Sequence, residues 1–430
     1  MEGQDNFIIN GLAGKRILEG QLAVKGAKNA ALKVLASTFL FKNSLSVSNV
    51  PAIRDVEQMF DLLTELGVTV TPTNFGEYNL DPSGDLHSVI NQDISKHLRA
   101  SVVLAGPILA RTGQVVFPHP GGCVIGARPI DFFLEGFKKM GAVVENGEDQ
   151  YAIKVPEGKL KGAELFFKNP SVTGTETFMM AAVLAEGQTV IKNAALEPEI
   201  VMLGQFLNQS GAQINGLGTT TITISGGELL DGQNGVCQIM PDRIEAGSFL
   251  LLAALAGRDL EITNIEVNHL DALIHSLILA GVKMEIKESA IRICEPQPVF
   301  NSLDIKTHEY PGFPTDLQAP LAVFLTQVKG QSYIFETIFE GRLNYLETLN
   351  QMGAKARIID VHRAMIDGPT ALSGREVSSP DLRAGLAYVL AAIIASGQSI
   401  VHNVHYIDRG YEEIEKRLSQ VGVDIERIIL

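Results

Sequence analysis

Hydrophobic and polar positions follow a helical period in six separate stretches of the chain, residues 54–70, 128–144, 197–214, 269–286, 342–358 and 411–428. In each stretch a glycine ends the helical pattern, and a short segment suited to a strand follows it. These glycines are Gly67, Gly141, Gly211, Gly281, Gly353 and Gly422. They recur about every 70 residues, which predicts an internal repeat of one folding unit. We expect each glycine to take the left-handed conformation that ends a helix.

A second, more apolar segment precedes each of these stretches. The six segments span residues 28–41, 98–113, 174–187, 242–257, 315–330 and 381–397. They are hydrophobic nearly all round, which is typical of helices buried in a core. One repeat therefore consists of a buried helix, a strand, an amphipathic helix, and a further strand or hairpin. Three repeats would share one core, so the chain is predicted to form two similar α/β domains.

Charged residues stand where the buried helices are expected to begin. Lys28, Arg99 and Arg383 are cations at such starts, where the helix dipole disfavours a cation unless an anion binds. Helix N-termini also carry unpaired N–H groups that bind phosphate and carboxylate. The sequence thus predicts an anion site, formed if the helix starts of the two domains face each other. For Asp242 and Thr175 we favour the ordinary interpretation of a helix N-cap.

The composition argues against several classes of partner and location. With 49 acidic and 35 basic residues, the net charge of -14 does not favour nucleic acid or a membrane surface. No basic leader followed by an apolar run opens the chain, and the longest apolar runs, 249–257 and 386–396, are too short to span a bilayer. Three cysteines do not make a disulfide framework, so we expect a reduced, cytoplasmic protein.

The segment PHPGGCVIGARPID, residues 118–131, combines glycines and prolines with one cysteine. Glycines on both sides of Cys123 and prolines at the edges predict a loop that can close as a lid. Arg128 lies close in sequence and would favour the thiolate, which suits a nucleophile or a proton donor. The alternative, a buried structural cysteine, suits Cys237 and Cys294 better, because both lie in segments that resemble strands.

Several acidic and basic residues are further candidates for chemistry. Asp316 follows the proline-rich turn YPGFP and either accepts a proton from a substrate hydroxyl or caps a helix, and the sequence favours neither. Asp381 and Asp408 each have an arginine nearby, Arg383 and Arg409. The cations suited to phosphate and carboxylate recognition are Lys28, Arg99, Arg128, Arg342, Arg383 and Arg409.

Two other kinds of site are not indicated by the sequence. His402 and His405 have a spacing used by metal ligands, but no cluster of further ligands accompanies them, so no metal is expected. Neither a P-loop nor a dinucleotide-binding glycine motif after a strand is present.

Eight motifs occur in order between residues 26 and 412: GAKNAAL, LRAS, PGGCVIGARPID, PDRIEAG, FPTDLQAP, ETIFEGR, DLRAG and HYIDRGYE. With them the chain resembles the UDP-N-acetylglucosamine 1-carboxyvinyltransferase family of enolpyruvyl transferases. The related shikimate-pathway enolpyruvyl transferase lacks the cysteine loop and has a different Lys-Ser motif where this chain has Lys28-Asn29. The resemblance implies two inside-out α/β barrel domains, each of three βαβαββ-type units, with the active site in the interdomain cleft. The expected bounds are residues 22–236 for one domain and residues 1–21 with 237–430 for the other.

The resemblance also implies an activity and the residues that perform it. The enolpyruvyl group of phosphoenolpyruvate would pass to the 3′-hydroxyl of UDP-N-acetylglucosamine with release of phosphate, a step of peptidoglycan precursor synthesis that needs no cofactor. By similarity, Cys123 is the proton donor and covalent anchor, Asp316 the base for the sugar hydroxyl, and Asp381 and Arg409 take part in catalysis. The residues implied for phosphoenolpyruvate are Lys28, Asn29, Arg128, Arg383 and Arg409. Those implied for the nucleotide sugar are Arg99, Arg128, Pro129, Ile130, Asp131, Phe132, Ser171, Val172, Asp316 and Ile338.

One segment departs from the family's pattern. In KNPSVTGTET, residues 168–177, Ser171 and Val172 align with the family's uridine contacts, but Thr173-Gly174 stand in swapped order. Two alternatives to the implied function stay open. One is transfer to another acceptor, such as a shikimate-type alcohol, and the other is a catalytically silent binding or regulatory protein. The resemblance further implies that the epoxide antibiotic fosfomycin alkylates Cys123.

Overall fold

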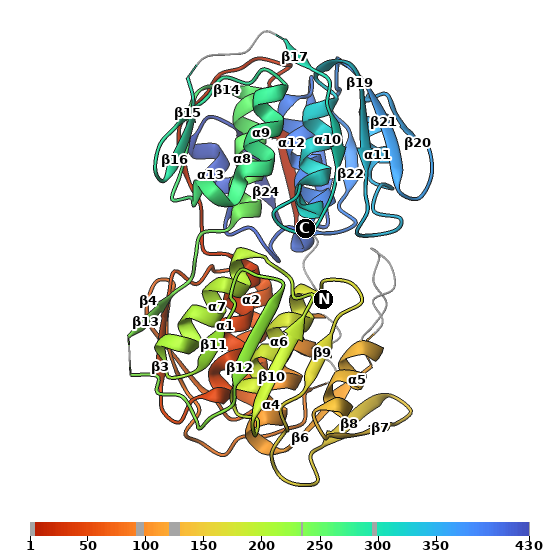
Figure 1. Cartoon of the computed structure of the whole chain (residues 1–430). Coiled ribbons are helices and arrows are strands. Elements are labelled where there is room, and N and C mark those ends of the chain that lie inside the picture. The colour runs from red at the N-terminus through yellow and green to blue at the C-terminus, as the bar shows by residue number, and fades with distance from the viewer. Residues whose placement is uncertain (1–4, 92–98, 120–129, 234, 295–298, 430) are drawn as a thin grey trace. The chain divides into compact units, whose positions relative to one another are not determined.

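The computed structural model describes residues 5–91, 99–119, 130–233, 235–294 and 299–429 (Figure 1). The described chain forms two compact units, one of residues 26–240 and one of residues 5–25 together with 241–429. No helix within these ranges is both long and apolar enough to cross a membrane.

The unit of residues 26–240 contains helices of both expected kinds. Its helices are α1 (Lys28–Ala36), α2 (Arg54–Glu65), α4 (Ala105–Thr112), α5 (Asp131–Lys139), α6 (Val172–Val183) and α7 (Pro198–Gln209). Its strands are β3 (Leu45–Ser48), β4 (Thr69–Asn74), β5 (Glu77–Asp81), β6 (Gln114–Pro118), β7 (Val143–Asn146), β8 (Gln150–Lys154), β9 (Glu164–Phe166), β10 (Gln188–Lys192), β11 (Gln213–Asn215), β12 (Thr221–Ser225) and β13 (Val236–Gln238).

The second unit repeats this succession of elements. Its helices are α8 (Arg243–Ala256), α9 (Asp271–Leu279), α10 (Gln318–Leu325), α11 (Leu346–Gln351), α12 (Leu382–Ile394) and α13 (Ile414–Gln420). Its strands are β1 (Asn6–Asn10), β2 (Leu18–Ala23), β14 (Gly257–Thr263), β15 (Glu285–Ile286), β16 (Ala290–Ile293), β17 (Phe300–Asn301), β18 (Asp304–Lys306), β19 (Val328–Phe335), β20 (Ala356–Ile358), β21 (Arg363–Gly368), β22 (Glu376–Ser378), β23 (Gln398–His402) and β24 (Asp424–Ile428).

The sheets show the repeat most directly. In the order β9, β10, β12, β11, a short strand pairs in parallel with the strand that follows a buried helix, and an antiparallel hairpin completes the sheet. The order β2, β14, β16, β15 repeats this pattern in the second unit. In the sheet β22, β23, β1, β24, the N-terminal strand β1 takes the third position, so the last repeat is completed by the start of the chain. The βαβ repeat predicted from the sequence is therefore confirmed.

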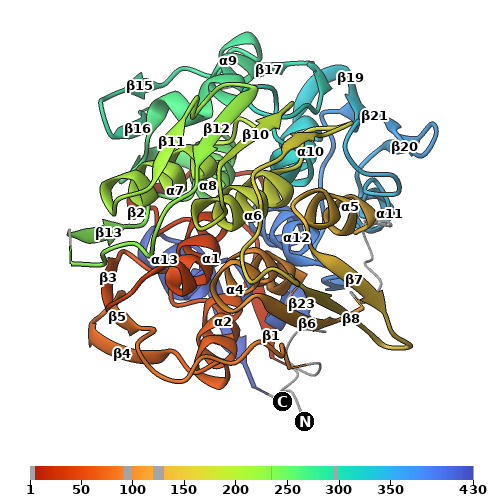
Figure 2. The ribbon, with the colours of Figure 1, turned by 60° about the horizontal axis from the view of Figure 1, so that its bottom comes forward.

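The apolar helices form the core of each unit. In the second unit α8, α10 and α12 pack on one another, and nearly all their side chains are buried. In the first unit α4 packs on α6, and Figure 2 shows the strands of its three sheets around α1, α4 and α6. These helices are buried because they carry almost no polar face, as their sequences predicted. All six glycines that end the amphipathic helices have positive φ, between 88° at Gly141 and 112° at Gly211, which confirms that prediction.

Of the two helix caps expected from the sequence, one differs in the structure. Thr175 was expected to cap a helix, but α6 begins at Val172 and its cap is Ser171, whose hydroxyl accepts a hydrogen bond from the amide of Gly174. The N-cap assignment of Thr175 is therefore wrong, and its hydroxyl instead accepts from the amide of Ala195 at 3.1 Å. Asp242 is an N-cap as predicted, because its carboxylate accepts from the amides of Ile244 and Glu245.

A buried carboxyl group in the first unit gives a testable dependence of stability on pH. Glu176 is 0% exposed and lies 3.2 Å from the ammonium group of Lys33. Burial raises the pKa of Glu176 from 4.5 to about 7, against the opposing effect of Lys33. Between pH 4.5 and about pH 7, Glu176 thus keeps its proton in the folded protein, whereas in the unfolded chain it has lost that proton. Stability from this group is present below pH 4.5 and is lost as the pH rises through about 7.

We therefore expect the unfolding free energies of wild type and of Glu176→Gln, both measured with urea, to depend differently on pH. Between pH 5 and pH 8 the difference in unfolding free energy should move in favour of the variant by roughly 3 kcal/mol, because glutamine never ionises. Glu135→Gln, which removes an exposed carboxylate paired with Lys138, is the control and should show no such trend. Parallel stability profiles for wild type and Glu176→Gln would contradict the raised pKa.

Candidate functional site

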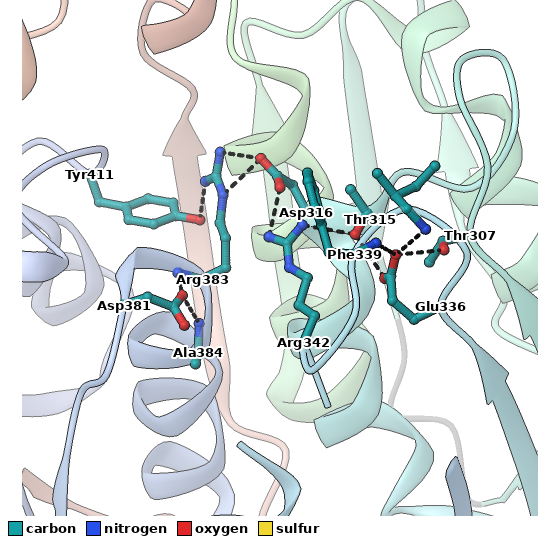
Figure 3. Close-up of polar contacts among 11 residues, drawn as sticks. Thr307, Thr315, Asp316, Glu336, Phe339, Arg342, Asp381, Arg383, Ala384 and Tyr411 are labelled. Carbon is teal, nitrogen blue, oxygen red and sulfur yellow. Dashed lines mark hydrogen bonds and ion pairs between the residues drawn. The ribbon is translucent and has the colours of Figure 1, made fainter. Parts of the chain in front are cut away.

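A carboxylate held between two arginines is the centre of the polar network in the unit of residues 241–429 (Figure 3). Asp316 lies in the 3₁₀ turn Thr315–Leu317 that leads into α10. Its Oδ1 accepts from Nη2 of Arg342 at 2.7 Å, and its Oδ2 accepts from Nε and Nη2 of Arg383 at 3.1 and 3.0 Å. No cap hydrogen bond is made by its side chain, so of the two sequence interpretations the structure excludes the helix cap.

The exposure of these groups shows which of them a ligand can reach. The side chain of Asp316 is 28% exposed, whereas those of Arg342 and Arg383 are 8% and 7% exposed. Burial works to raise the pKa of Asp316, but the charges of Arg383 and Arg342 outweigh burial and hold the pKa well below its usual range. Asp316 is therefore an ionised carboxylate with an accessible surface, and the two arginines cover its inner side.

Arg383 links Asp316 to a buried tyrosine. It is the second residue of α12, and its Nη1 donates to the hydroxyl of Tyr411 at 2.8 Å. Burial alone would lower the pKa of Arg383, but Tyr411 and Asp316 reverse this and raise it above its ordinary value. Burial raises the pKa of Tyr411 to about 12, although Arg383 acts in the opposite direction. The guanidinium is thus a permanent cation at the start of a helix, neutralised by Asp316.

The two Asp–Arg neighbours seen in the sequence are not side-chain pairs. Asp381 caps α12 and accepts from the backbone amides of Arg383 and Ala384, at 2.8 and 3.0 Å. Asp408 instead holds Arg427, with contacts of 2.6 and 3.0 Å. Arg409 follows the 3₁₀ turn Val404–Tyr406 and is half-buried.

His402 also has protein partners. Its two ring nitrogens lie 2.7 Å from the side-chain oxygens of Asn6 and Glu376. Within the described ranges no group of His, Cys, Asp and Glu side chains is arranged to hold a metal ion.

In the unit of residues 26–240, the cation at the start of α1 has a carboxylate partner. Lys28 is the first residue of α1, and its Nζ lies 2.6 Å from Asp55 in α2, whose side chain is 3% exposed. Asn29 follows and is half-buried. The unfavourable position of Lys28 at a helix N-terminus is therefore offset by Asp55 as well as by any anion that binds.

A second group of predicted residues in this unit surrounds the start of α6. Phe132, the second residue of α5, is 36% exposed, and its ring lies directly against Gly174. Ser171 and Val172 occupy the same turn as the cap and first residue of α6. Asp131 is exposed, while Ile130 packs partly against the core. The structure thus brings together five of the residues that the resemblance implied for the nucleotide sugar, namely Ile130, Asp131, Phe132, Ser171 and Val172.

Four predicted residues lie wholly or partly outside the described structure. Cys123, Arg128 and Pro129 fall between residues 119 and 130, outside the described ranges. Arg99 begins the 3₁₀ turn Arg99–Leu104, and only its backbone is described. Cys237 and Cys294 are free, and burial raises the pKa of Cys237 to about 12, consistent with a structural thiol.

Several partners in the network were not identified from the sequence. Nothing in the sequence linked Asp55 to Lys28 or Tyr411 to Arg383, because these contacts join separate segments of the chain. Arg342 was identified as a cation but not as a partner of Asp316. Glu336 and Arg342 both lie in the motif ETIFEGR, and this motif was the signal that could have identified Glu336 as part of the network around Arg342.

Comparison with known proteins places these residues in a family. The family model described as EPSP synthase (3-phosphoshikimate 1-carboxyvinyltransferase) matches residues 12–418. The chain belongs to the EPSP synthase family. Within it, UDP-N-acetylglucosamine 1-carboxyvinyltransferase 2 of Carboxydothermus hydrogenoformans is 43% identical over 99% of this chain and 99% of its own length. UDP-N-acetylglucosamine 1-carboxyvinyltransferase of Haemophilus ducreyi is 42% identical over 95% of both chains.

Two solved structures share the fold at much lower identity. The enolpyruvyl transferase NikO of Streptomyces tendae superposes with a TM-score of 0.88 at 19% identity, and all of both chains is covered. EPSP synthase of Acinetobacter baumannii gives 0.71 at 18% identity, over 99% of this chain and 100% of its own. The chain therefore has the mixed α/β enolpyruvyl transferase fold.

Proposed function

We propose that this chain transfers the enolpyruvyl group of phosphoenolpyruvate to the 3′-hydroxyl of UDP-N-acetylglucosamine. The bond between C2 of phosphoenolpyruvate and its phosphate oxygen breaks, a bond between C2 and the sugar oxygen forms, and phosphate leaves with the hydroxyl proton. The observation that carries the proposal is the full-length similarity, at 42–43% identity, to proteins named for this acceptor. The product serves peptidoglycan precursor synthesis, and the cytoplasmic location inferred from the sequence stays a prediction.

The accessible carboxylate of Asp316 supports the role of base in this reaction. Addition of an alcohol to an enol phosphate needs a base at the hydroxyl, a proton donor at the methylene carbon and cations near the departing phosphate. Asp316 accepts the proton of the 3′-hydroxyl, and Asp381 and Arg383 line the reacting centre. To gain basicity, Asp316 has to give up part of its pairing with Arg342 or Arg383, and an arriving anionic substrate competes for those cations.

The remaining roles follow the family's motifs residue by residue. Cys123 donates a proton to the methylene carbon as the alcohol adds, that carbon loses a proton again as phosphate is eliminated, and Arg409 assists catalysis. Phosphoenolpyruvate is held by Lys28, Asn29, Arg128, Arg383 and Arg409. The nucleotide sugar is held by Arg99, Arg128, Pro129, Ile130, Asp131, Phe132, Ser171, Val172, Asp316 and Ile338. The two three-repeat domains, expected from the sequence at residues 22–236 and at residues 1–21 with 237–430 and close to the two compact units, are inside-out α/β barrels, and the repeated sheets around buried helices support this.

Phosphate release tests the proposed acceptor. With phosphoenolpyruvate present, the purified protein should release phosphate when UDP-N-acetylglucosamine is added and not when shikimate 3-phosphate is added. Release with shikimate 3-phosphate alone would replace the proposal by a shikimate-type activity. Tight binding of the nucleotide sugar by a folded protein that never releases phosphate would instead indicate a silent binding protein.

Cys123 gives a separate prediction. If its thiolate is favoured by Arg128, fosfomycin should alkylate it, because a thiolate opens the epoxide. Intact mass spectrometry should show one added fosfomycin on wild type and none on Cys123→Asp. Cys237 is the internal reference, since burial raises the pKa of its thiol to about 12 and it should not react. An unmodified wild-type protein would show that Cys123 is not activated as proposed.

A further inference from the structure

Glu336 is a fully buried carboxylate directly after β19, at the opposite end of the network from Tyr411 (Figure 3). A buried charge is costly unless hydrogen bonds satisfy it. Its Oε1 accepts from the hydroxyl of Thr307 at 3.0 Å and from the amides of Ile338 and Phe339 at 2.8 and 3.2 Å. Its Oε2 accepts from the hydroxyl of Thr315 at 2.7 Å. These bonds hold Glu336 in one place.

The direction of the hydrogen bonds connects Glu336 to the candidate base. Thr315 has a single hydroxyl proton, and because it is donated to Glu336, the oxygen presents a lone pair to Arg342. Nη1 of Arg342 donates to that oxygen at 2.8 Å, while Nη2 donates to Asp316 at 2.7 Å. A guanidinium is planar, so fixing one of its nitrogens also fixes the other. Glu336 therefore orients Asp316 through Thr315 and Arg342.

The same carboxylate fixes the loop that carries Ile338. The amides of Ile338 and Phe339 both point to Glu336, and the ring of Phe339 lies 5.2 Å from the guanidinium carbon of Arg342. Ile338 is one of the residues assigned to the nucleotide sugar. One buried group thus sets the position of a candidate base and of a sugar-contacting loop in the same unit.

We propose that Glu336 is a positioning residue for the reaction, acting on Asp316 through Thr315 and Arg342 and on the sugar through the loop at Ile338. The inference rests on the proposed function, because it assigns Glu336 a task in that chemistry. A purely structural carboxylate would affect folding alone. A positioning residue has a different consequence, because a displacement of about 1 Å at a reacting group can cost about a hundredfold in rate.

Steady-state kinetics of folded variants separate these two roles. Thr315→Val removes the hydroxyl that joins Glu336 to Arg342 and should lower kcat about ten- to a hundredfold, with KM for phosphoenolpyruvate changed less than threefold. Thr315→Ser keeps the hydroxyl and should restore kcat to within about threefold of wild type. Glu336→Gln should lower kcat similarly and also raise KM for UDP-N-acetylglucosamine, because it weakens the bonds to the loop amides.

The control is Thr326→Val, which replaces a buried threonine of the same unit, located after α10 and bonded to Val323 rather than to the network. Its kcat should stay near that of wild type. A Thr315→Val protein with wild-type kcat, or a Thr315→Ser protein as slow as Thr315→Val, would overturn the positioning role while leaving the proposed function intact. A wild-type protein that does not turn over these substrates would overturn both.

Discussion

Replacing Asp316 by asparagine is expected to lower kcat by about 10³-fold while the protein stays folded. Asparagine has nearly the same shape but cannot take up the proton of an alcohol, so the role of base is lost. The variant also leaves Arg342 and Arg383 with a neutral partner in place of the carboxylate at 2.7 and 3.0 Å. Because Arg383, which is proposed to hold phosphoenolpyruvate, keeps its positive charge in the variant, KM for phosphoenolpyruvate should rise much less than kcat falls.

The measurement is kcat for wild type and Asp316→Asn, with the thermal midpoint of each as a check on folding. Asp360→Asn is a matched control, because Asp360 also pairs with an arginine, Arg363, but that pair lies on the surface. It should leave kcat near wild type. If Asp316→Asn kept more than a tenth of wild-type kcat, Asp316 would not be the base.

Replacing Arg383 by lysine should cost about 10²-fold in kcat/KM and about 2 kcal/mol of stability. The planar guanidinium group of Arg383 binds Asp316 through two of its nitrogens and Tyr411 through the third. A single ammonium group cannot reproduce this geometry, so Asp316 loses its orientation and the hydroxyl of Tyr411, a residue only 1% exposed, loses a donor.

Kinetics and urea unfolding should be measured on the same Arg383→Lys preparation. The matched change at the surface, Arg363→Lys, keeps a cation beside Asp360 and should alter neither quantity appreciably, since exposed pairs contribute little. Stability loss without loss of kcat/KM would mean that Arg383 has only a structural role.

The part of the fold that could be predicted from the sequence is the part set by local chemistry. Glycine is the residue that readily takes the left-handed conformation, so Gly67, Gly211 and their counterparts marked the helix ends, and all of them have positive φ. The buried helices α8, α10 and α12 could also be predicted locally, because a helix that is apolar all round has no polar face to expose to solvent. Thr175 was misassigned because Ser171, also able to cap a helix, lies one turn earlier.

The part that could not be predicted depends on which distant segments meet. Asp316 at a helix start has the same local sequence whether it caps the helix or binds arginines. Its partner Arg342 lies 26 positions away on the second helix of the same repeat, and Arg383 lies 67 positions away in the next repeat. Similarly, Lys28 was expected to need a bound anion, and nothing local showed that Asp55 would supply a carboxylate. Which charged side chains pair in this protein depends on the tertiary fold, whereas the repeat can be recognised from the local sequence.

The most direct test of the proposed reaction follows the enolpyruvyl carbon itself. Phosphoenolpyruvate labelled with ¹³C at C2 is incubated with UDP-N-acetylglucosamine and the purified protein, and the product is examined by NMR. The proposed reaction predicts that the labelled carbon becomes an enol ether carbon bonded to the 3′-oxygen of the sugar, with one phosphate released for each. Labelled phosphoenolpyruvate that remains unchanged beside folded protein, or a label attached at any other oxygen, would contradict it.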